Sequence, residues 1–220
     1  MEPLKSTLLF LSALLPIVNP LGGSPIFLLL TRDFSTKDRT ALSRQVALNS
    51  FLLLAVSYFV GSHILAFFGI SLPVVQVGGG LVVISTGWAM LTRQEEGDRQ
   101  SPEHHHVSHD DIFKNAFYPL TLPLTVGPGS ISIAITLGAN VPRQNGFALM
   151  PFVPALVGSF LVALSVFLCY ASAERLGRLF GHTGMTVILR LTSFLLVCIG
   201  VQIMWNGISA LVTPLLARIH

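Results

Sequence analysis

The sequence predicts an all-α integral membrane protein in which six transmembrane helices form two inverted three-helix repeats, with helices one and four broken. The 220-residue chain is 52% hydrophobic and only 10% charged, whereas roughly 25% of residues are charged in an average soluble domain. Its uncharged segments are long enough to cross a bilayer, and a motif of three prolines occurs in each half. We therefore expect a single membrane domain over residues 1–220, divided into a first repeat, a cytoplasmic loop and a second repeat at 1–92, 93–111 and 112–220.

Stretches without charged residues locate the predicted helices, because a helix needs about 20 apolar residues to cross the bilayer. The first stretch lies between Lys5 and Arg32. A stretch of double length, between Arg44 and Arg93, is interpreted as two helices joined by a short turn around residues 63–73. Three further stretches follow, bounded in order by Lys114, Arg143, Glu174, Arg190 and Arg218.

Basic residues are concentrated in the loops after the first, third and fifth predicted helices. Lys and Arg in short loops remain on the cytoplasmic side of a membrane. These loops and their edges contain Arg32, Lys37, Arg39, Arg44, Arg93, Arg99, Lys114, Arg175, Arg178 and Arg190. The opposite side has only Lys5, Arg143 and Arg218. Both termini are therefore expected outside the cytoplasm, and the net charge of +3 reflects topology rather than nucleic-acid binding.

The proline motif relates the two halves. Residues 14–27 read "LLPIVNPLGGSPIF" and residues 118–133 read "YPLTLPLTVGPGSISI"; prolines 16, 20 and 25 match prolines 119, 123 and 128 at one offset. The ends of the halves can also be aligned, with Gln76 opposite Arg190 and Met90 opposite Met204. Because each half contains an odd number of spans, homologous halves must have opposite orientations in the membrane.

Helix breakers within a span indicate a binding site. Proline removes a backbone donor and leaves carbonyls that hydrocarbon cannot satisfy, so paired broken helices are typical of transport sites. Polar side chains and glycines accompany the prolines in both halves. The candidate substrate-binding residues are Asn19, Pro20, Gly22, Ser24, Thr121, Pro123, Thr125, Gly127, Pro128, Gly129 and Ser130. The alternative is that these residues only allow close helix packing.

The motifs "NPLGGSPIFL", "LPLTVGPGSIS" and "RLTSFLLVCIGVQIMWNGI" resemble the MarC family of bacterial inner-membrane proteins, which is related to the small neutral amino-acid transporters called SnatA and lies near the LysE exporter superfamily. The resemblance implies six spans, an inner-membrane location and, for the characterised transporter members, movement of small neutral amino acids such as glycine or alanine. An inner-membrane location together with the loop charges places both termini on the periplasmic side. It places the ligand region on Asn19, Pro20, Gly22, Pro123, Thr125, Gly127, Pro128, Gly129 and Ser130. One position departs from the family pattern: Gln76 stands where members usually have Arg.

The coupling mechanism is not determined by the sequence. No Asp or Glu lies in the middle of a predicted span, which disfavours a buried carboxylate relay. Sodium coupling, uncoupled export and a proton route through His63 remain alternatives, and no cofactor is expected. Arg190, about one turn inside the sixth span, is a possible charge partner: it either extends to the headgroups or contacts Glu174 or a substrate carboxylate.

Other functions are less well supported by the motifs. The loop containing His104, His105, His106 and His109 resembles a metal site, but consecutive His point in different directions, so no metal is expected. An intramembrane hydrolase using Ser24 or Ser130 with His63 or His182 has neither a GxSxG nor an HExxH motif, so the chain is not expected to be an enzyme. A membrane scaffold or regulatory protein is the other alternative. The expected partners are lipid and a small solute, and "GGG" at 78–80 could pack within one chain or between copies in a homo-oligomer.

Overall fold

The computed structural model describes residues 2–32, 34–92, 116–140 and 152–216. These residues form helices and contain no strand. The elements are α1 (Glu2–Val18), α2 (Pro20–Leu30), α3 (Thr36–Phe67), α4 (Leu72–Thr92), η1 (Ala116–Thr125), α6 (Pro128–Ala139), α7 (Phe152–Ala171) and α8 (Ala173–Leu216). The predicted loop 93–111, with its four histidines, lies outside the described residues.

The helices confirm the predicted all-α, multi-pass membrane fold. Five segments are long and apolar enough to cross a membrane: Leu4–Leu30, Thr36–Phe67, Leu72–Thr92, Phe152–Ala171 and Thr183–Pro214. A sixth span results if η1 and α6, which meet at a bend of 70°, are taken together. The first span consists of α1 and α2, which are interrupted at Asn19. Both spans predicted to be broken are therefore interrupted.

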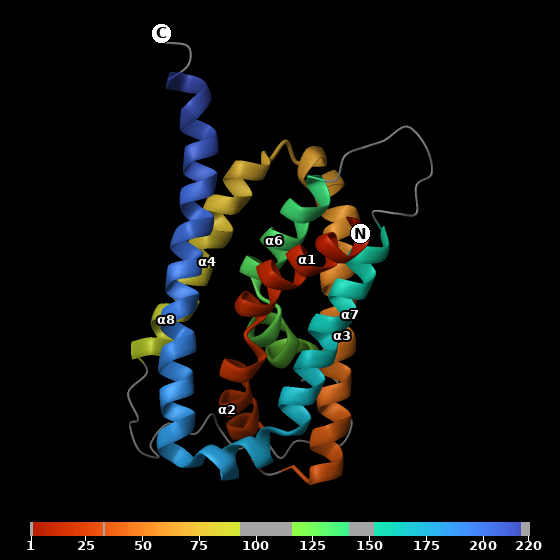
Figure 1. Cartoon of the computed structure of the whole chain (residues 1–220), viewed down its shortest axis with the longest axis vertical. Coiled ribbons are helices and arrows are strands. Elements are labelled where there is room, and N and C mark those ends of the chain that lie inside the picture. Colours follow the sequence, from red (N-terminus) through yellow and green to blue (C-terminus); the bar gives the residue numbers. More distant parts are fainter. Residues whose placement is uncertain (1, 33, 93–115, 141–151, 217–220) are drawn as a thin grey trace.

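Glycines allow two sharp changes of direction. Gly69 has a φ of 67° in the turn between α3 and α4, a conformation that glycine adopts without steric penalty. The Ile70 amide donates to the Leu65 carbonyl at 2.9 Å and closes this turn. In α8, Gly181 has a φ of 63° and a ψ of −179°, which separates a short N-terminal segment, Ala173–Phe180, from the long span that follows. In Figure 1 this short segment runs across the lower end of the molecule.

The packing of the helices is symmetric between the two halves. Helix α4, which is the third span, packs on α8, the sixth span. Helix α3, the second span, packs on α7, the fifth span. The remaining contacts come in equivalent pairs. The contact of α1 with α7 corresponds to that of α6 with α3, and the contact of α2 with α8 corresponds to that of α6 with α4. Exchanging spans one, two and three with four, five and six therefore converts each of these pairs into another of them, the pattern expected of an inverted repeat.

Glycines that face each other across the α4–α8 contact show which residues of the two helices are equivalent. A Cβ on Gly80 would lie 2.7 Å from the Gly200 carbonyl oxygen, and a Cβ on Gly200 would lie 2.9 Å from the Gly80 carbonyl oxygen. A Cβ on Gly87 would similarly contact the Ser193 carbonyl oxygen, and a Cβ on Gly207 would contact the Pro73 carbonyl oxygen. Small residues thus bring the two backbones into contact. The geometry equates residue 80 with 200 and residue 87 with 207, which differs from the alignment of Gln76 with Arg190.

The interrupted spans lie at the centre of the molecule. In Figure 1, α1 runs downward from the N-terminus to α2 inside the bundle, while α6 rises from η1 toward the end opposite α2. The buried core around them is formed by side chains from both halves. Its largest fully buried members are Leu14, Phe27, Leu42, Val46, Leu54, Val126, Val162, Val166 and Tyr170.

Candidate functional site

The first span is interrupted at Asn19. This residue has left-handed backbone angles, φ 46° and ψ 58°, which Asn tolerates better than most side chains. Pro20 follows as the first residue of α2, where its missing N–H is no loss. The Asn19 Oδ1 accepts a hydrogen bond from the Gly22 amide at 3.1 Å and caps α2. The side-chain Nδ2 of Asn19 is buried and has no hydrogen-bond partner among the described residues.

Ser24 compensates for the proline that follows it. Pro25 has no N–H to donate to the carbonyl of Leu21, and the Ser24 hydroxyl donates to that carbonyl at 2.8 Å. Ser24 is buried and does not line the central cavity described below. In this structure its hydroxyl therefore stabilises α2.

The second interruption is larger than the first. Within η1, Tyr118 and Leu122 have extended backbone angles, and each precedes a proline, Pro119 or Pro123, through a cis peptide bond. Threonine hydroxyls donate to two carbonyls of this irregular segment. Thr121 donates to the Ala116 carbonyl at 2.6 Å, and Thr125 donates to the Leu120 carbonyl at 2.7 Å.

Helix α6 begins at this interruption with free amides. Gly127 is its N-cap, and no side chain caps it. The first helical bond runs from the Ile131 amide to the Gly127 carbonyl at 3.1 Å, so the N–H groups of Gly129 and Ser130 precede the hydrogen-bonded ladder. A helix N-terminus of this kind favours anionic groups.

A cavity of about 170 Å³ lies where the two interruptions meet. Its polar lining residues are Asn19, Thr86, Thr125 and Ser130, together with the backbone at Gly23, Gly127 and Gly129. Apolar side chains complete it: Ile17, Val18, Val82, Val83, Met90, Pro123, Leu124, Pro128 and Leu196. None of these described lining residues is charged.

The structure brings most of the predicted site residues to this cavity, but not all. Those that line it are Asn19, Pro123, Thr125, Gly127, Pro128, Gly129 and Ser130. Pro20, Gly22, Ser24 and Thr121 lie in the same interrupted segments but do not line it. Gly22 packs against Thr192, whose Oγ1 would lie 2.6 Å from a Cβ at that position. Arg190 is exposed and does not line the cavity.

Tyr170 was not among the predicted site residues. It is fully buried, its hydroxyl lies 2.9 Å from Thr125 Oγ1, and its ring stacks on Phe27 with a centroid distance of 4.4 Å. A Cβ added to Gly23 would lie 2.6 Å from the Tyr170 hydroxyl. Tyr170 therefore connects both interrupted spans through α7. A single tyrosine in an apolar helix gives no periodic signal, so the sequence alone does not single it out.

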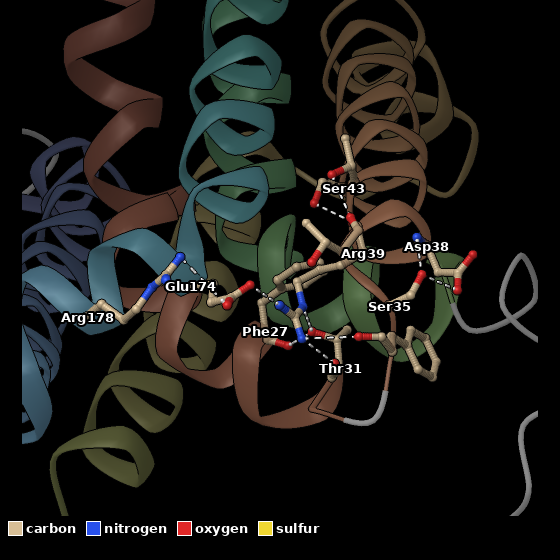
Figure 2. A network of polar contacts seen from close by, with 11 residues as sticks. Phe27, Thr31, Ser35, Asp38, Arg39, Ser43, Glu174 and Arg178 are labelled. Atoms are coloured by element: carbon tan, nitrogen blue, oxygen red, sulfur yellow. Dashed lines mark hydrogen bonds and ion pairs between the residues drawn. The ribbon is translucent and has the colours of Figure 1, made fainter.

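A polar network joins the two halves near one end of the molecule (Figure 2). Arg39 of α3 is buried, and its Nη1 lies 3.1 Å from Glu174 Oε2 of α8. The same guanidinium donates from Nε to Thr31 Oγ1 at 3.2 Å and from Nη2 to the Thr31 carbonyl at 3.0 Å. Glu174, one of the alternatives considered for Arg190, is thus paired with Arg39. It is also near Arg178, at 3.7 Å.

Metal ligands do not gather in the described part of the chain. Within residues 2–32, 34–92, 116–140 and 152–216, no three His, Cys, Asp or Glu side chains are placed to hold a metal ion. The four histidines of the predicted loop lie outside these ranges.

Comparison with known proteins agrees with the fold. The family described as "MarC family integral membrane protein" matches residues 4–212. The chain is 36% identical to UPF0056 inner membrane protein MarC of Escherichia coli K12 over 214 residues, covering 94% of this chain and 96% of the relative. The protein of the same name from Shigella flexneri matches with the same identity and coverage. No solved structure matches the chain. The chain therefore belongs to the MarC family of integral membrane proteins, whose named relatives are inner-membrane proteins.

Proposed function

We propose that this protein is a transporter of small neutral solutes, with amino acids such as glycine or alanine as the favoured class. The observation that supports this most directly is the uncharged cavity of about 170 Å³ between two interrupted spans. Interrupted helices from two related halves, meeting at one cavity, are the arrangement that secondary transporters use to hold their substrates.

The size and lining of the cavity favour a small substrate without net charge. Pockets for drug-sized ligands occupy roughly 300–1,000 Å³, so about 170 Å³ suits a molecule of only a few heavy atoms. A substrate with net charge would need a buried counter-charge, and the described lining residues provide none.

A zwitterion matches the backbone groups at this cavity. Its carboxylate fits the free amides of Gly129 and Ser130 at the start of α6 and the unpaired Nδ2 of Asn19. Its ammonium fits carbonyls left without a helical donor. Leu124, which lines the cavity, precedes Pro128 by four residues, and proline has no N–H to offer that carbonyl.

The proposal also covers topology and activity class. We place both termini on the periplasmic side, with the Leu30–Thr36 turn and the start of α8 on the cytoplasmic side. We propose no catalytic role: the Ser24 and Ser130 hydroxyls each donate to a nearby backbone carbonyl, those of Leu21 and Gly127. The transport assay below, run with and without sodium and pH gradients, distinguishes sodium coupling from proton coupling.

The test is counterflow in proteoliposomes containing the purified full chain and labelled glycine or alanine, with and without sodium and pH gradients. Wild type is expected to exchange label, and Thr125→Val and Asn19→Ala are expected to reduce the rate at least tenfold. Thr92→Val is the matched control, because its hydroxyl donates within α4, to the Trp88 carbonyl, and Thr92 does not line the cavity. Undiminished transport by both cavity variants would refute the site. Absence of transport and binding for every neutral amino acid by well-folded protein would refute the substrate class.

A further inference from the structure

A second and larger cavity lies away from the central site. Its volume is about 690 Å³, and it is formed by the end of α2, the following turn, the start of α3 and the N-terminal segment of α8. Four charged side chains line it: Arg32, Arg39, Arg178 and Glu174. The transport proposal assigns no role to it.

The cavity has more positive than negative side chains, and these side chains differ in how far they are already paired with one another. Arg39 is buried and committed to Glu174, Thr31 and the Phe34 carbonyl. Glu174 is shared between Arg39 and Arg178, with the Arg178 contact longer at 3.7 Å. Figure 2 shows Glu174 lying between these two arginines. Arg178 is mostly exposed, and Arg32 is exposed with no ion pair among the described residues.

The described lining residues therefore carry three guanidinium groups against one carboxylate. Two of these groups are accessible, that of Arg32 and that of Arg178, which also lies 3.7 Å from Glu174. These charges are those of the lining residues; the neighbouring Asp33 lies outside the residues that the structure describes. Guanidinium groups bind phosphate through paired, charge-assisted hydrogen bonds. The polar part of the cavity thus suits a phosphate ester.

The rest of the wall is mostly apolar, with Ser35 and Thr36 as its uncharged polar side chains. Pro25, Leu28, Leu29, Phe34 and Met185 line the cavity beside the arginines. Arginine next to an apolar surface at a helix end is the combination expected where a headgroup and the start of its acyl chains meet a membrane protein. A soluble phosphate would use the arginines but not these side chains.

The position of the cavity agrees with this occupant. The segment Ala173–Phe180 crosses the end of the molecule at an angle to the long span of α8 (Figure 1). It exposes Arg175 and Arg178 together with Leu179 and Phe180. A short helix with charged and apolar exposed side chains suits the interface between headgroups and hydrocarbon. By the distribution of Lys and Arg, this end faces the cytoplasm.

We propose that this cavity binds the headgroup of an anionic phospholipid of the cytoplasmic leaflet, with the phosphate held by Arg32 and Arg178 and the proximal acyl chains against Leu28, Leu29 and Met185. The bound lipid would connect the end of the first broken span to the start of α8. Each accessible arginine is expected to contribute about fivefold to lipid affinity, since one basic residue near a membrane surface is worth about 1 kcal/mol.

Native mass spectrometry of the purified full chain, titrated with phosphatidylglycerol or phosphatidylcholine in neutral detergent, tests this inference. Wild type should retain phosphatidylglycerol in preference to phosphatidylcholine. Arg32→Gln and Arg178→Gln should each weaken phosphatidylglycerol binding about fivefold, whereas Arg178→Lys, which keeps the charge and loses the paired hydrogen bonds, should weaken it less. Arg44→Gln is the control, because Arg44 is exposed on α3 and does not line the cavity. Equal retention of both lipids, or equal losses for Arg44→Gln and Arg32→Gln, would overturn the proposal.

A competition with inorganic phosphate separates the two sources of the anion. Millimolar phosphate should leave bound phosphatidylglycerol in place, because it cannot replace the contacts of the acyl chains. Displacement by phosphate at that concentration would instead identify a site for a soluble anion. Circular dichroism and gel filtration establish that each variant remains folded, so a loss of lipid is attributable to the substituted side chain.

Discussion

The hydroxyl of Tyr170 lies 2.9 Å from Thr125 Oγ1, and this contact links α7 to the irregular segment before α6. Thr125 also donates to the Leu120 carbonyl, so its hydroxyl proton is engaged there and its oxygen can accept from Tyr170. Because Tyr170 stacks on Phe27 of α2, one side chain supports both walls of the central cavity. The fifth span thereby contacts both interrupted spans through one side chain.

Substituting Tyr170 with Phe tests this role. The ring stacking on Phe27 would remain, while the buried Thr125 hydroxyl would lose one partner. We expect a loss of about 1 kcal/mol in the free energy of unfolding, together with weaker substrate binding. Thermal unfolding in detergent and a substrate titration are the measurements. Tyr118→Phe is the control, because Tyr118 is 66% exposed; equal effects of the two substitutions would contradict the assignment.

The Arg39 and Glu174 pair is expected to stabilise the contact between the two halves. Arg39→Ala should reduce the free energy of unfolding by about 3 kcal/mol, the lower end of the range for breaking a buried ion pair, since its side chain is 9% exposed. Glu174→Ala should cost about 1 kcal/mol, because the carboxylate is 45% exposed and partly screened. The double variant should cost less than the sum.

A double-mutant cycle by chemical or thermal unfolding measures this coupling. Arg44→Ala serves as the control for removal of an exposed arginine from α3 and should change stability by no more than about 0.5 kcal/mol. Strict additivity of the two single substitutions would show that the 3.1 Å contact contributes nothing to the fold.

Much of the fold follows from simple features of the sequence. Charge-free stretches predict the spans because charged side chains are costly in hydrocarbon. The three-proline motif predicts both interruptions because proline cannot complete a helical hydrogen-bond ladder. Seven of the eleven proposed substrate-binding residues line the central cavity, since the motif marks where the backbone opens. Pro20, Gly22, Ser24 and Thr121 share the motif and are buried, but they do not line the cavity.

Other features depend on contacts between distant segments. Tyr170 and Thr86 reach the site region only because α7 and α4 pack beside the interruptions, and neither belongs to a motif. The pairing of Arg39 with Glu174 spans the two halves and cannot be distinguished by loop charge from the pairing of Arg190 with Glu174. The α4–α8 register was also missed, because apolar helices can be aligned at several offsets until their backbone contacts are known.

Cysteine labelling tests the orientation in the membrane. Ser35 and Ser71 are both exposed and lie just before α3 and α4, near opposite ends of α3. In a background with Cys169 and Cys198 replaced by alanine, Ser71→Cys should react with a membrane-impermeant maleimide in intact cells in which reagent reaches the periplasm. Ser35→Cys should react only after the inner membrane is opened. The reverse pattern would invert the topology and move the arginine-lined cavity to the periplasmic side.

Gly78 and Gly80, two residues apart in α4, provide a test of the packed interface with α8. A Cβ at Gly80 would lie 2.6 Å from the Met204 amide nitrogen, which is backbone and cannot move aside, whereas a Cβ at Gly78 would meet nothing within 4 Å. We expect Gly80→Ala to lower the free energy of unfolding by about 1–3 kcal/mol through overpacking. Gly78→Ala should leave it unchanged or raise it by up to about 1 kcal/mol, because alanine favours helix.

The reciprocal contact makes a second, independent prediction. A Cβ at Gly200 would lie 2.8 Å from the Ile84 amide nitrogen, the equivalent obstruction on the other helix. Gly200→Ala should therefore destabilise the protein to a similar extent as Gly80→Ala, as measured by thermal unfolding in the same detergent. Because both substitutions push apart the same two backbones, their combination should cost less than the sum. A large effect of Gly80→Ala with none of Gly200→Ala would contradict the symmetric packing of α4 and α8.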